Sequence, residues 1–376
     1  MLTKEEFNEV FNIYCLSKDE YIGIRPIKSG HINNTYTLYF DKGNRVKRYL
    51  LQEININVFK NPEELMANIE KVTVFCHDKL KSKKVVNYKN KFLRIFKTKD
   101  GKSYFVSSRN HYYRLFHFVE NAVTFQTAED DKMFENAGYT IGTFLNLLSD
   151  FPADQLNETI LNFHNTAIRY QTFLESLKAD KLNRAATCKE EINFVLEHKD
   201  ITHQITDLLE TKQMPTRVIH NDTKLNNIMF DFNNHDGLCL IDLDTIMPGS
   251  IVYDFGDAVR SGCNLGAEDE KDLSKVIFDV NLFRSFSQGF LNAVKESITD
   301  VELHNLTMGA IIMTFECGMR FLTDYLDGDT YFKTQYEDHN LIRCRSQFHL
   351  VKQMLEKKDE LDKIILECRE NSLKSN

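Results

Sequence analysis

The sequence predicts an α+β fold in which a small antiparallel sheet comes first and a larger, mainly helical region follows. The first third of the chain contains short runs that alternate β-branched or aromatic residues with polar ones, a pattern typical of strands. From about residue 127 onward, long stretches repeat apolar residues every three or four positions, as helices do. We therefore expect an N-terminal lobe at residues 1–119 and a C-terminal lobe at residues 120–376.

The N-terminal region opens with a predicted helix in MLTKEEFNEVF, where Thr3 and Glu6 have capping-box spacing. Strands are expected at IGIRPI, TYTLYF and RVKRYLLQEIN, and again at FLRIF, SYFVSS and YYRLFHFV. One helix, NPEELMANIEKVTVFCHDKL, separates these two groups, with Asn61 as its cap and Pro62 in its first turn. Glu64 stands where it would complete a second capping box.

The C-terminal region is expected to be helical at DDKMFENAGYTIGTFLNLL, ETILNFHNTAIRYQTFLESL and VELHNLTMGAIIMTFECGMRFLTDYL. Strands return only briefly, at RVIH, NIMFDF and LCLIDL. A sheet-rich lobe before a larger helical lobe is the layout of protein kinases, and it gives the short strands a natural place beside a catalytic loop.

Composition excludes several classes of protein. The chain has 376 residues, enough for two cores, and its net charge of −8 argues against a general nucleic-acid-binding function. Its longest nearly apolar run, Leu306–Phe315, is about half of a membrane span, so we expect no membrane segment. The eight cysteines show no zinc-binding spacing, and the N-terminus lacks a signal-peptide pattern. These features predict free thiols and a cytoplasmic protein.

The segment VIHNDTKLNNIMFD contains the most informative motif of the chain. His220, Asp222 and Asn227 have the H-x-D-x-x-x-x-N spacing of a kinase catalytic loop. In that loop the aspartate receives the proton of the substrate hydroxyl, and the asparagine binds magnesium. Asp222 is therefore the candidate base, against the alternative of an ordinary surface carboxylate.

A predicted β-hairpin extends this motif into a magnesium site. NIMFDF and GLCLIDLD are separated by NNHDG, a cluster of turn-forming residues centred near His235. Such a hairpin would fold Asn227 back beside Asp242, giving an amide oxygen and a carboxylate, which are suitable ligands for Mg²⁺. Asp244, two residues further along, is expected to assist as a third ligand.

The triplet D-F-G at residues 254–256 resembles the metal-binding motif of protein kinases. It lies beyond the predicted hairpin and directly before the helix-like GDAVRS, so we assign Asp254 another role. We expect it to cap that helix or to brace the catalytic loop from below. His220 is expected to be a buried structural residue that bonds the loop backbone.

Two further segments carry candidate phosphate contacts. SGHINNTY, residues 29–36, could cover phosphates through the side chains of Ser29, Asn33, Asn34 and Thr35 and through backbone N–H groups, with Gly30 as its one glycine. A plain polar hairpin turn explains the same residues. Lys224 could steady the transferred phosphoryl group, or it could be a solvated loop lysine.

Taken together, these motifs resemble the aminoglycoside phosphotransferase and choline kinase family, and within it most closely the N-acetylhexosamine 1-kinases. The resemblance covers nearly the whole chain. It rests on the following segments: SGHINNTY, LLQEIN, FHNTAIR, HNDTKLNNIMFD, LIDLDTIMPG, YDFGDAVR and RFLTDYLDGDTYF. It implies a bilobal, protein-kinase-like fold that uses ATP and Mg²⁺.

The resemblance also implies roles for individual residues. Asp222 becomes the base, Asn227 and Asp242 become magnesium ligands, and Arg320 and Tyr331 match positions that contact the sugar. For Arg320, a salt bridge with the helix neighbours Glu316 or Asp324 is the alternative.

Nucleotide contacts follow from the same resemblance. Adenine would be held near Val119 and Glu120, between the lobes. The third strand normally supplies a lysine to the phosphates of ATP. Here that position holds Gln52, a substitution that looks characteristic of the hexosamine kinases, and Lys47, Arg48 or Lys224 could supply the missing charge.

The function expected from the sequence is transfer of the γ-phosphoryl group of ATP to the anomeric hydroxyl of N-acetylglucosamine or N-acetylgalactosamine. One alternative is an ATP-dependent kinase for another small alcohol, such as another sugar, an aminoglycoside or choline. A second alternative is a nucleotide-binding protein without turnover. The expected partners are the sugar and ATP, with no nucleic acid and no membrane, for a monomer or a homodimer. The preferred hexosamine and its anomer are left open.

Overall fold

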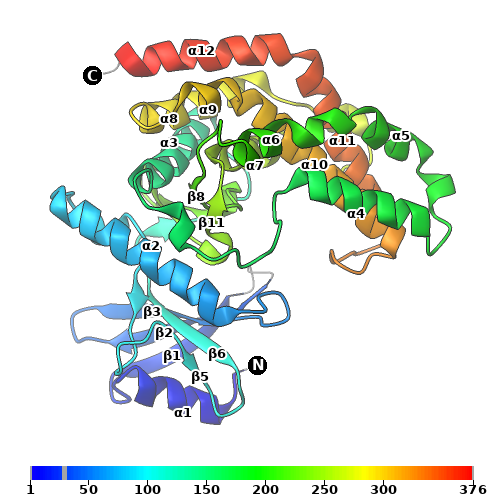
Figure 1. The fold of residues 1–376 in the computed structure, drawn as a ribbon. Helices are drawn as coiled ribbons and strands as arrows, with labels where there is room; N and C mark the ends of the chain where they lie inside the picture. The colour runs from blue at the N-terminus through cyan, green and yellow to red at the C-terminus, as the bar shows by residue number, and fades with distance from the viewer. Residues whose placement is uncertain (1, 28–31, 375–376) are drawn as a thin grey trace. The chain divides into compact units, whose positions relative to one another are not determined.

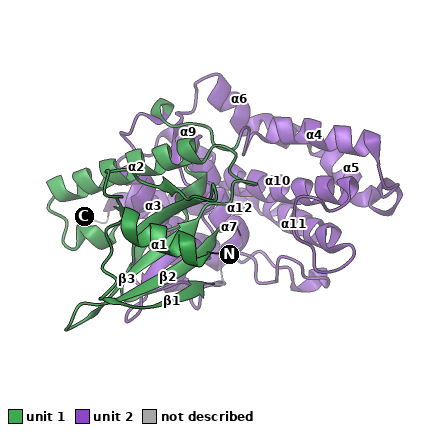
Figure 2. Cartoon of the chain, turned by 90° about the horizontal axis from the view of Figure 1, so that it is seen from below, with its two compact units in different colours: residues 1–122, 154–160, 238–247 green, residues 123–153, 161–237, 248–376 purple. Residues whose placement is uncertain are grey.

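The computed structural model describes residues 2–27 and 32–374, which form two compact units (Figure 2). Unit 1 comprises residues 1–122, 154–160 and 238–247, and unit 2 comprises residues 123–153, 161–237 and 248–376. An antiparallel sheet dominates the first and helices dominate the second, which confirms the predicted α+β fold. The chain enters or leaves unit 1 several times, and the domain boundary at residues 119–120 stays a prediction.

The sheet of unit 1 contains all the strands expected in the N-terminal region (Figure 1). Its main path runs β1-β2-β3-β6-β4 with antiparallel neighbours, and β5 pairs with β6. The strands are β1 (Tyr21–Ile27), β2 (Asn34–Asp41), β3 (Val46–Glu53), β4 (Ile95–Phe96), β5 (Phe105–Val106) and β6 (Tyr112–His117). Because side chains alternate along a strand, the two faces of this sheet carry different residues.

One sheet face packs on α1 (Lys4–Ile13). Val10 and Phe11 of this helix join Leu51, Tyr113 and other strand residues in one buried apolar cluster. The predicted capping box between Thr3 and Glu6 is confirmed, and it fixes the first turn of α1.

The long helix α2 (Pro62–Ser82) begins with proline in its first turn, as predicted. The capping box predicted for this helix is wrong: the Asn61 side chain donates to Glu64 Oε2 (3.1 Å) instead of accepting a backbone N–H. Asn68 on α2 holds the two later segments of unit 1, since its Nδ2 donates to the carbonyls of Asn157 (2.8 Å) and Ile246 (3.1 Å). Residues 154–160 and 238–247 are therefore anchored to α2 by one buried amide.

Unit 2 is built from helices around an apolar core (Figure 1). They are α3 (Asp131–Leu147), α4 (Thr166–Ala179), α5 (Lys189–Glu197), α6 (Gln204–Glu210), α7 (Ile251–Gly262), α8 (Val280–Val294), α9 (Asp300–His304), α10 (Leu306–Asp327), α11 (His339–Glu356) and α12 (Lys358–Lys374). Helices α7 and α10 approach closely where two glycines meet: a Cβ on Gly256 would lie 2.3 Å from the carbonyl oxygen of Gly309. This crossing fixes α7, the helix that contains the D-F-G triplet.

The remaining strands are short and lie outside the main sheet of unit 1. They are β7 (Ala122–Val123), β8 (Arg217–Ile219), β9 (Ile228–Asp231), β10 (Gly237–Leu240) and β11 (Met247–Gly249). The predicted turn after β9 is confirmed within unit 2, because Asp231 N donates to Asp236 O (2.8 Å) and His235 N donates to Asp231 O (3.0 Å). This turn directs the chain toward β10.

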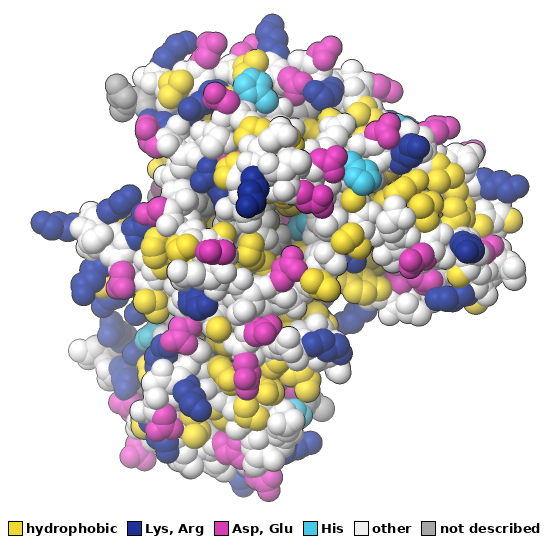
Figure 3. Space-filling model, viewed as in Figure 1, with side chains coloured by type: hydrophobic (Ala, Val, Ile, Leu, Met, Phe, Trp, Pro, Cys, Tyr) yellow, Lys and Arg dark blue, Asp and Glu magenta, His cyan; other side chains and the backbone are white. Residues whose placement is uncertain are grey.

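The surface drawn in Figure 3 mixes charges of both signs. Basic and acidic side chains alternate over this face instead of gathering by sign, so it offers no continuous basic surface to nucleic acid. Among the helices of residues 2–27 and 32–374, none combines the length and the apolar character that crossing a bilayer requires.

Candidate active site

The candidate base lies in the loop between β8 and β9, within unit 2. Asp222 Oδ1 lies 2.9 Å from the Nζ of Lys224, and Asp222 Oδ2 accepts a hydrogen bond from Asn227 Nδ2 (2.8 Å). The Asp222 side chain is still 30% exposed. The carboxylate is thus held in one orientation and remains accessible to a substrate hydroxyl.

Two buried carboxylates of α7 hold the backbone of this loop. Asp254 accepts hydrogen bonds from the N–H groups of His220 and Asn221, both at 2.7 Å. Asp257 accepts one from the N–H of Thr223 (3.0 Å). Asn221, directly before the base, has a left-handed backbone with φ of 67°, which these bonds maintain.

The bracing role predicted for Asp254 is confirmed, and the alternative of a helix cap is wrong. The N-cap of α7 is Ser250, whose side chain accepts from Val252 N. Asp254 is fully buried, and its carboxylate faces backbone donors instead of a metal position. Burial raises the pKa of Asp254 to about 6, although the charge of His220 and the two backbone donors oppose this shift.

Charges beside the base are balanced by a small ionic network. Burial disfavours the charged form of Lys224, but the carboxylates of Asp222 and Asp257 outweigh it and raise the pKa of this lysine. Asp257 is itself buried, yet Arg260, 2.7 Å away, and Lys224 lower its pKa. Asp222 therefore works beside a lysine that stays protonated at neutral pH.

His220 is a structural residue, as predicted. Its ring is fully buried against Phe144, with ring centroids 5.7 Å apart, and its Nδ1 accepts a hydrogen bond from Asp222 N (3.3 Å). The histidine therefore shapes the loop backbone.

The residues predicted to bind magnesium suit a hard cation. Asn227 uses its Nδ2 to donate to the backbone oxygen and the carboxylate of Asp222, so its Oδ1 is the atom that can ligate a metal. Asp242 offers a carboxylate from a left-handed position with φ of 60°. These residues belong to different units, and their meeting stays a prediction. Within either unit, the described residues form no cluster of three or more His, Cys, Asp or Glu side chains suited to a metal.

Asp244, the third predicted ligand, has close partners inside unit 1. Its Oδ1 lies 2.6 Å from Nη1 of Arg114, and its Oδ2 accepts from Nδ2 of Asn33 (2.6 Å). The carboxylate is 4% exposed. A metal role for Asp244 stays a prediction, and a metal ion would have to compete with Arg114 and Asn33 for this carboxylate.

Most of the predicted nucleotide contacts are distributed over unit 1, and Lys224 lies beside Asp222 in unit 2. Gln52 Nε2 donates to Thr35 Oγ1 (3.1 Å), Asn34 Nδ2 donates to Glu53 Oε2 (3.1 Å), and Glu120 forms an ion pair with Arg48. Val119 is buried, next to Glu120. Ser29 and Gly30 lie outside the described residues. The nucleotide-binding roles stay predictions.

The predicted sugar contacts lie together in unit 2. The guanidinium of Arg320 lies among the rings of Phe163, Tyr331 and Phe332, with centroids 5.6–5.8 Å away, and Arg320 Nη2 is 3.5 Å from the Tyr331 hydroxyl. The two carboxylates considered as salt-bridge partners have other roles. Glu316 binds His164 and Thr166, and Asp324 accepts from the backbone N–H groups of residues 330–332.

A family model described as a phosphotransferase enzyme family matches residues 23–273 of the chain. The chain belongs to this phosphotransferase family. Its fold is also that of solved kinases. A choline kinase from Cryptosporidium parvum matches with a TM-score of 0.59 and 15% identity, covering 95% of this chain and 97% of that one.

Two further structures agree with this fold. An ethanolamine kinase from Plasmodium vivax matches with a TM-score of 0.57 and 14% identity, over 93% of this chain and 90% of that one. An aminoglycoside phosphotransferase from Alicyclobacillus acidocaldarius matches with a TM-score of 0.54 and 12% identity, over 96% and 95%. At these identities the likeness establishes the kinase-like fold of the phosphotransferase and says nothing of its substrate.

The structure of this phosphotransferase also shows contacts to the candidate site residues and their neighbours that sequence reasoning missed. His164 contacts the carbonyl oxygen of Asn221 through Nε2 (3.4 Å) and Glu316 through Nδ1 (2.8 Å). Its segment FHNTAIR stood out in the resemblance, but nothing local linked it to the catalytic loop. Arg114 was also missed, although an arginine inside the apolar strand YYRLFHFV was a usable signal.

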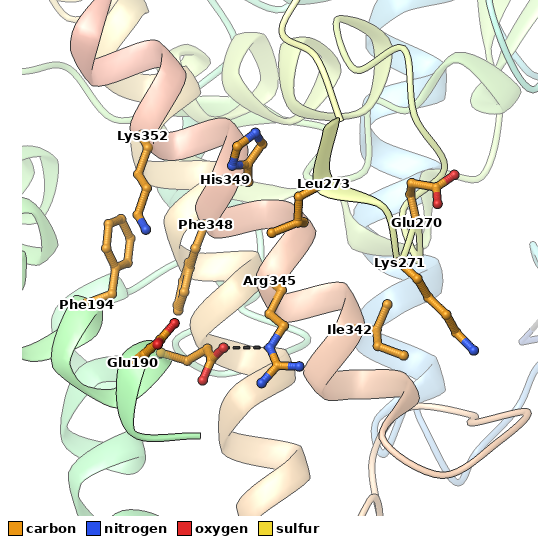
Figure 4. Close-up of a pocket in the computed structure, with 11 residues that line it drawn as sticks. Glu190, Phe194, Glu270, Lys271, Leu273, Ile342, Arg345, Phe348, His349 and Lys352 are labelled. Carbon is orange, nitrogen blue, oxygen red and sulfur yellow. Dashed lines mark hydrogen bonds and ion pairs between the residues drawn. The ribbon is translucent and has the colours of Figure 1, made fainter. Parts of the chain in front are cut away.

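A separate cavity of about 510 Å³ lies in unit 2 between α5, α11 and the segment around residue 271 (Figure 4). Phe194 and Phe348 form an apolar wall, and Arg345 crosses the cavity to pair with Glu191 at 2.6 Å. None of the predicted site residues of the phosphotransferase lines it. The cavity therefore does not mark the catalytic site.

Proposed function

We propose that this phosphotransferase transfers the γ-phosphoryl group of ATP to the anomeric hydroxyl of an N-acetylhexosamine, N-acetylglucosamine or N-acetylgalactosamine. The braced Asp222 loop supports the reaction class. One observation supports the substrate: the guanidinium of Arg320 lies among three aromatic rings within unit 2.

The surroundings of Arg320 favour a neutral, oxygen-rich substrate. A fixed positive charge repels the ammonium groups of choline-like alcohols and aminoglycosides, whereas its N–H groups can donate to hydroxyl or acetamido oxygens. The exposed Tyr331 adds an apolar ring face and a phenol hydroxyl. Asp324 positions this tyrosine by accepting its backbone N–H (2.8 Å).

Two consecutive residues connect Arg320 with the base. Phe163 packs its ring 5.6 Å from the Arg320 guanidinium, and the next residue, His164, contacts the carbonyl oxygen of Asn221 (3.4 Å). Asn221 immediately precedes Asp222. A sugar bound against Arg320 would therefore have the base within the same part of unit 2.

In the proposed reaction Asp222 orients the anomeric hydroxyl and accepts its proton late in an in-line transfer. Lys224 stays protonated and holds the carboxylate. Asn227 and Asp242 would ligate Mg²⁺, which when bound neutralises charge on the β- and γ-phosphates. Gln52, Asn34, Val119 and Glu120 would contact the nucleotide, together with Ser29 and Gly30.

The test is release of ADP from Mg-ATP with single acceptors, with Asp222→Asn as the blank. The acceptors are N-acetylglucosamine, N-acetylgalactosamine, glucose, choline and kanamycin. Turnover on an N-acetylhexosamine, with coupling of phosphorus to the anomeric proton in the NMR spectrum, supports the proposal. Turnover confined to choline or kanamycin would refute the proposed N-acetylhexosamine substrate but would still agree with ATP-dependent phosphoryl transfer.

The alternative substrate class is another small alcohol, favoured only by the choline, ethanolamine and aminoglycoside kinases that share the fold. Arg320→Gln separates the two classes. Loss of the positive charge should weaken N-acetylhexosamine turnover, whereas a cationic acceptor should be used better. If the protein binds the nucleotide but turns over none of the acceptors, the result would favour a nucleotide-binding protein without catalytic activity.

A further inference from the structure

Arg114 is a fully buried arginine in the sheet of unit 1. In the register of the sheet it lies directly opposite Gln52 on β3, and Gln52 lies opposite Thr35 on β2. Its neighbours Tyr113 and Leu115 point to the α1 side, so Arg114 points to the α2 side, where Nη1 lies 3.8 Å from the sulfur of Met66. Three polar side chains therefore form a row across three strands.

The hydrogen bonds of this row fix the orientation of the Gln52 amide. Arg114 Nε donates to Gln52 Oε1 (2.9 Å), and a guanidinium can only donate, so the amide oxygen must face the arginine. The amide nitrogen then faces Thr35, where it donates to Oγ1 at 3.1 Å. Gln52 is thereby presented as a donor at the position where kinases carry a phosphate-binding lysine.

The charge of Arg114 is balanced by Asp244. The two groups are 2.6 Å apart, and their side chains are 1% and 4% exposed. A buried ion pair is seldom more stable than apolar residues of similar size, so stability alone gives little reason for it. The pair does join β6 to the segment that carries Asp242. Asn33 ties the same carboxylate to the start of β2, with Nδ2 donating at 2.6 Å.

We propose that Arg114 is a positioning residue for the phosphates of ATP and takes the place of the lysine missing from the third strand. It orients the Gln52 amide toward the nucleotide, and through Asp244 it holds the segment that presents Asp242. The lysine–glutamate pair of protein kinases is replaced by Gln52, Arg114 and Asp244. This inference rests on the proposed use of ATP and is independent of the acceptor.

The first test measures binding of Mg-ATP by titration calorimetry without an acceptor, and the KM for ATP where there is turnover. Arg114→Met should weaken ATP binding about tenfold, because a misoriented donor loses a hydrogen bond to a charged group. Arg114→Lys should retain part of the affinity, since it keeps the charge but not the fork of donors. Arg345→Met is the matched control, because it breaks an arginine–carboxylate pair in the separate cavity and should leave ATP affinity unchanged.

A double variant separates an effect on ATP positioning from an effect on folding. Arg114→Met with Asp244→Asn removes the unpaired buried carboxylate, so thermal stability should recover while ATP affinity stays low. Full recovery of ATP affinity along with stability would overturn the inference, because Arg114 would then serve the fold alone.

A lysine introduced at position 52 gives the sharpest contrast. Gln52→Lys combined with Arg114→Met restores one cation to this row of side chains and should recover most of the lost ATP affinity. Gln52→Lys alone places two cations side by side and should weaken both stability and ATP binding. Equal effects of Gln52→Lys in both backgrounds would overturn the inference. A wild-type protein that binds no Mg-ATP would instead refute the proposed function itself.

Discussion

Asp222 in unit 2 and Asp244 in unit 1 are both aspartates beside a cation, yet their surroundings differ. Asp222 is 30% exposed next to Lys224, and its loop is held from below by backbone bonds to Asp254 and Asp257. Asp244 is 4% exposed, and its own oxygens lie against Arg114 and Asn33. Hydrogen bonds to the backbone of the loop leave the Asp222 carboxylate available for chemistry. Contacts to the carboxylate of Asp244 itself make that residue a structural link.

The largest expected effect belongs to Asp222→Asn. An amide cannot accept the substrate proton, so kcat should fall about a thousandfold while Mg-ATP affinity changes little. Release of ADP and titration calorimetry measure the two quantities. Asp207→Asn, at a 63% exposed side chain of the same unit, is the control and should leave both unchanged. Full activity of Asp222→Asn would show that Asp222 is not the base, and the contrast between a reactive Asp222 and a structural Asp244 would fail.

The next effect concerns Asp244→Asn. This change leaves the Arg114 charge buried without a carboxylate, and the free energy of unfolding should fall by about 3 kcal/mol, as measured by chemical denaturation. The dependence of activity on magnesium concentration decides between the two roles of Asp244. Asp242→Asn should raise the magnesium requirement strongly, and Asp244→Asn should raise it little. An equal increase in both variants would make Asp244 a metal ligand.

His164→Gln tests the buried contact of His164 with Glu316 next to the loop of Asp222. Burial alone would raise the pKa of Glu316, but His164 and Arg320 outweigh it and hold this pKa below its usual value of 4.5. A lowered carboxyl pKa contributes stability that is present above about pH 4.5 and is lost as the pH falls below it.

Without His164 its share of this contribution disappears and that of Arg320 remains, so His164→Gln should cost about 2 kcal/mol at neutral pH. The difference from the wild type should shrink as the pH falls below 4.5, which denaturation at pH 3.5, 5 and 7 would detect. His203→Gln, at an exposed position, is the matched control. A difference that does not change with pH would show that the histidine acts through packing alone.

The smallest expected effect is that of Lys224→Met. Its side chain is 42% exposed, and a partly solvated ion pair contributes little, so kcat/KM should fall by about fivefold at most. Steady-state kinetics of ADP release measure this change. A much larger loss confined to kcat would show that Lys224 contacts the transferred phosphoryl group.

Local patterns determined much of this protein. The alternating strands, the capping box of Thr3 and Glu6, the turn after β9 and the catalytic-loop spacing could all be read from the sequence. The bracing role of Asp254 was one of two predicted alternatives, although the structure places this residue inside α7 and not before a helix. The strands, the capping box, the turn and the loop spacing depend on residues near one another in the chain, where backbone geometry limits the outcome, whereas Asp254 lies 34 positions from the His220 N–H whose hydrogen bond it accepts.

Only the tertiary structure decided which distant side chains meet. The pair of Arg114 with Asp244 joins a strand to a much later segment, and the pair of His164 with Glu316 joins the start of α4 to the middle of α10. No local spacing in the sequence encodes such pairs, because they form when packing brings distant buried groups together. A buried charged group without a partner destabilises the fold, and this free-energy cost favours the observed partners. The sequence thus indicated the chemistry expected of the loop around Asp222, and the packing decided which residues hold this loop in place.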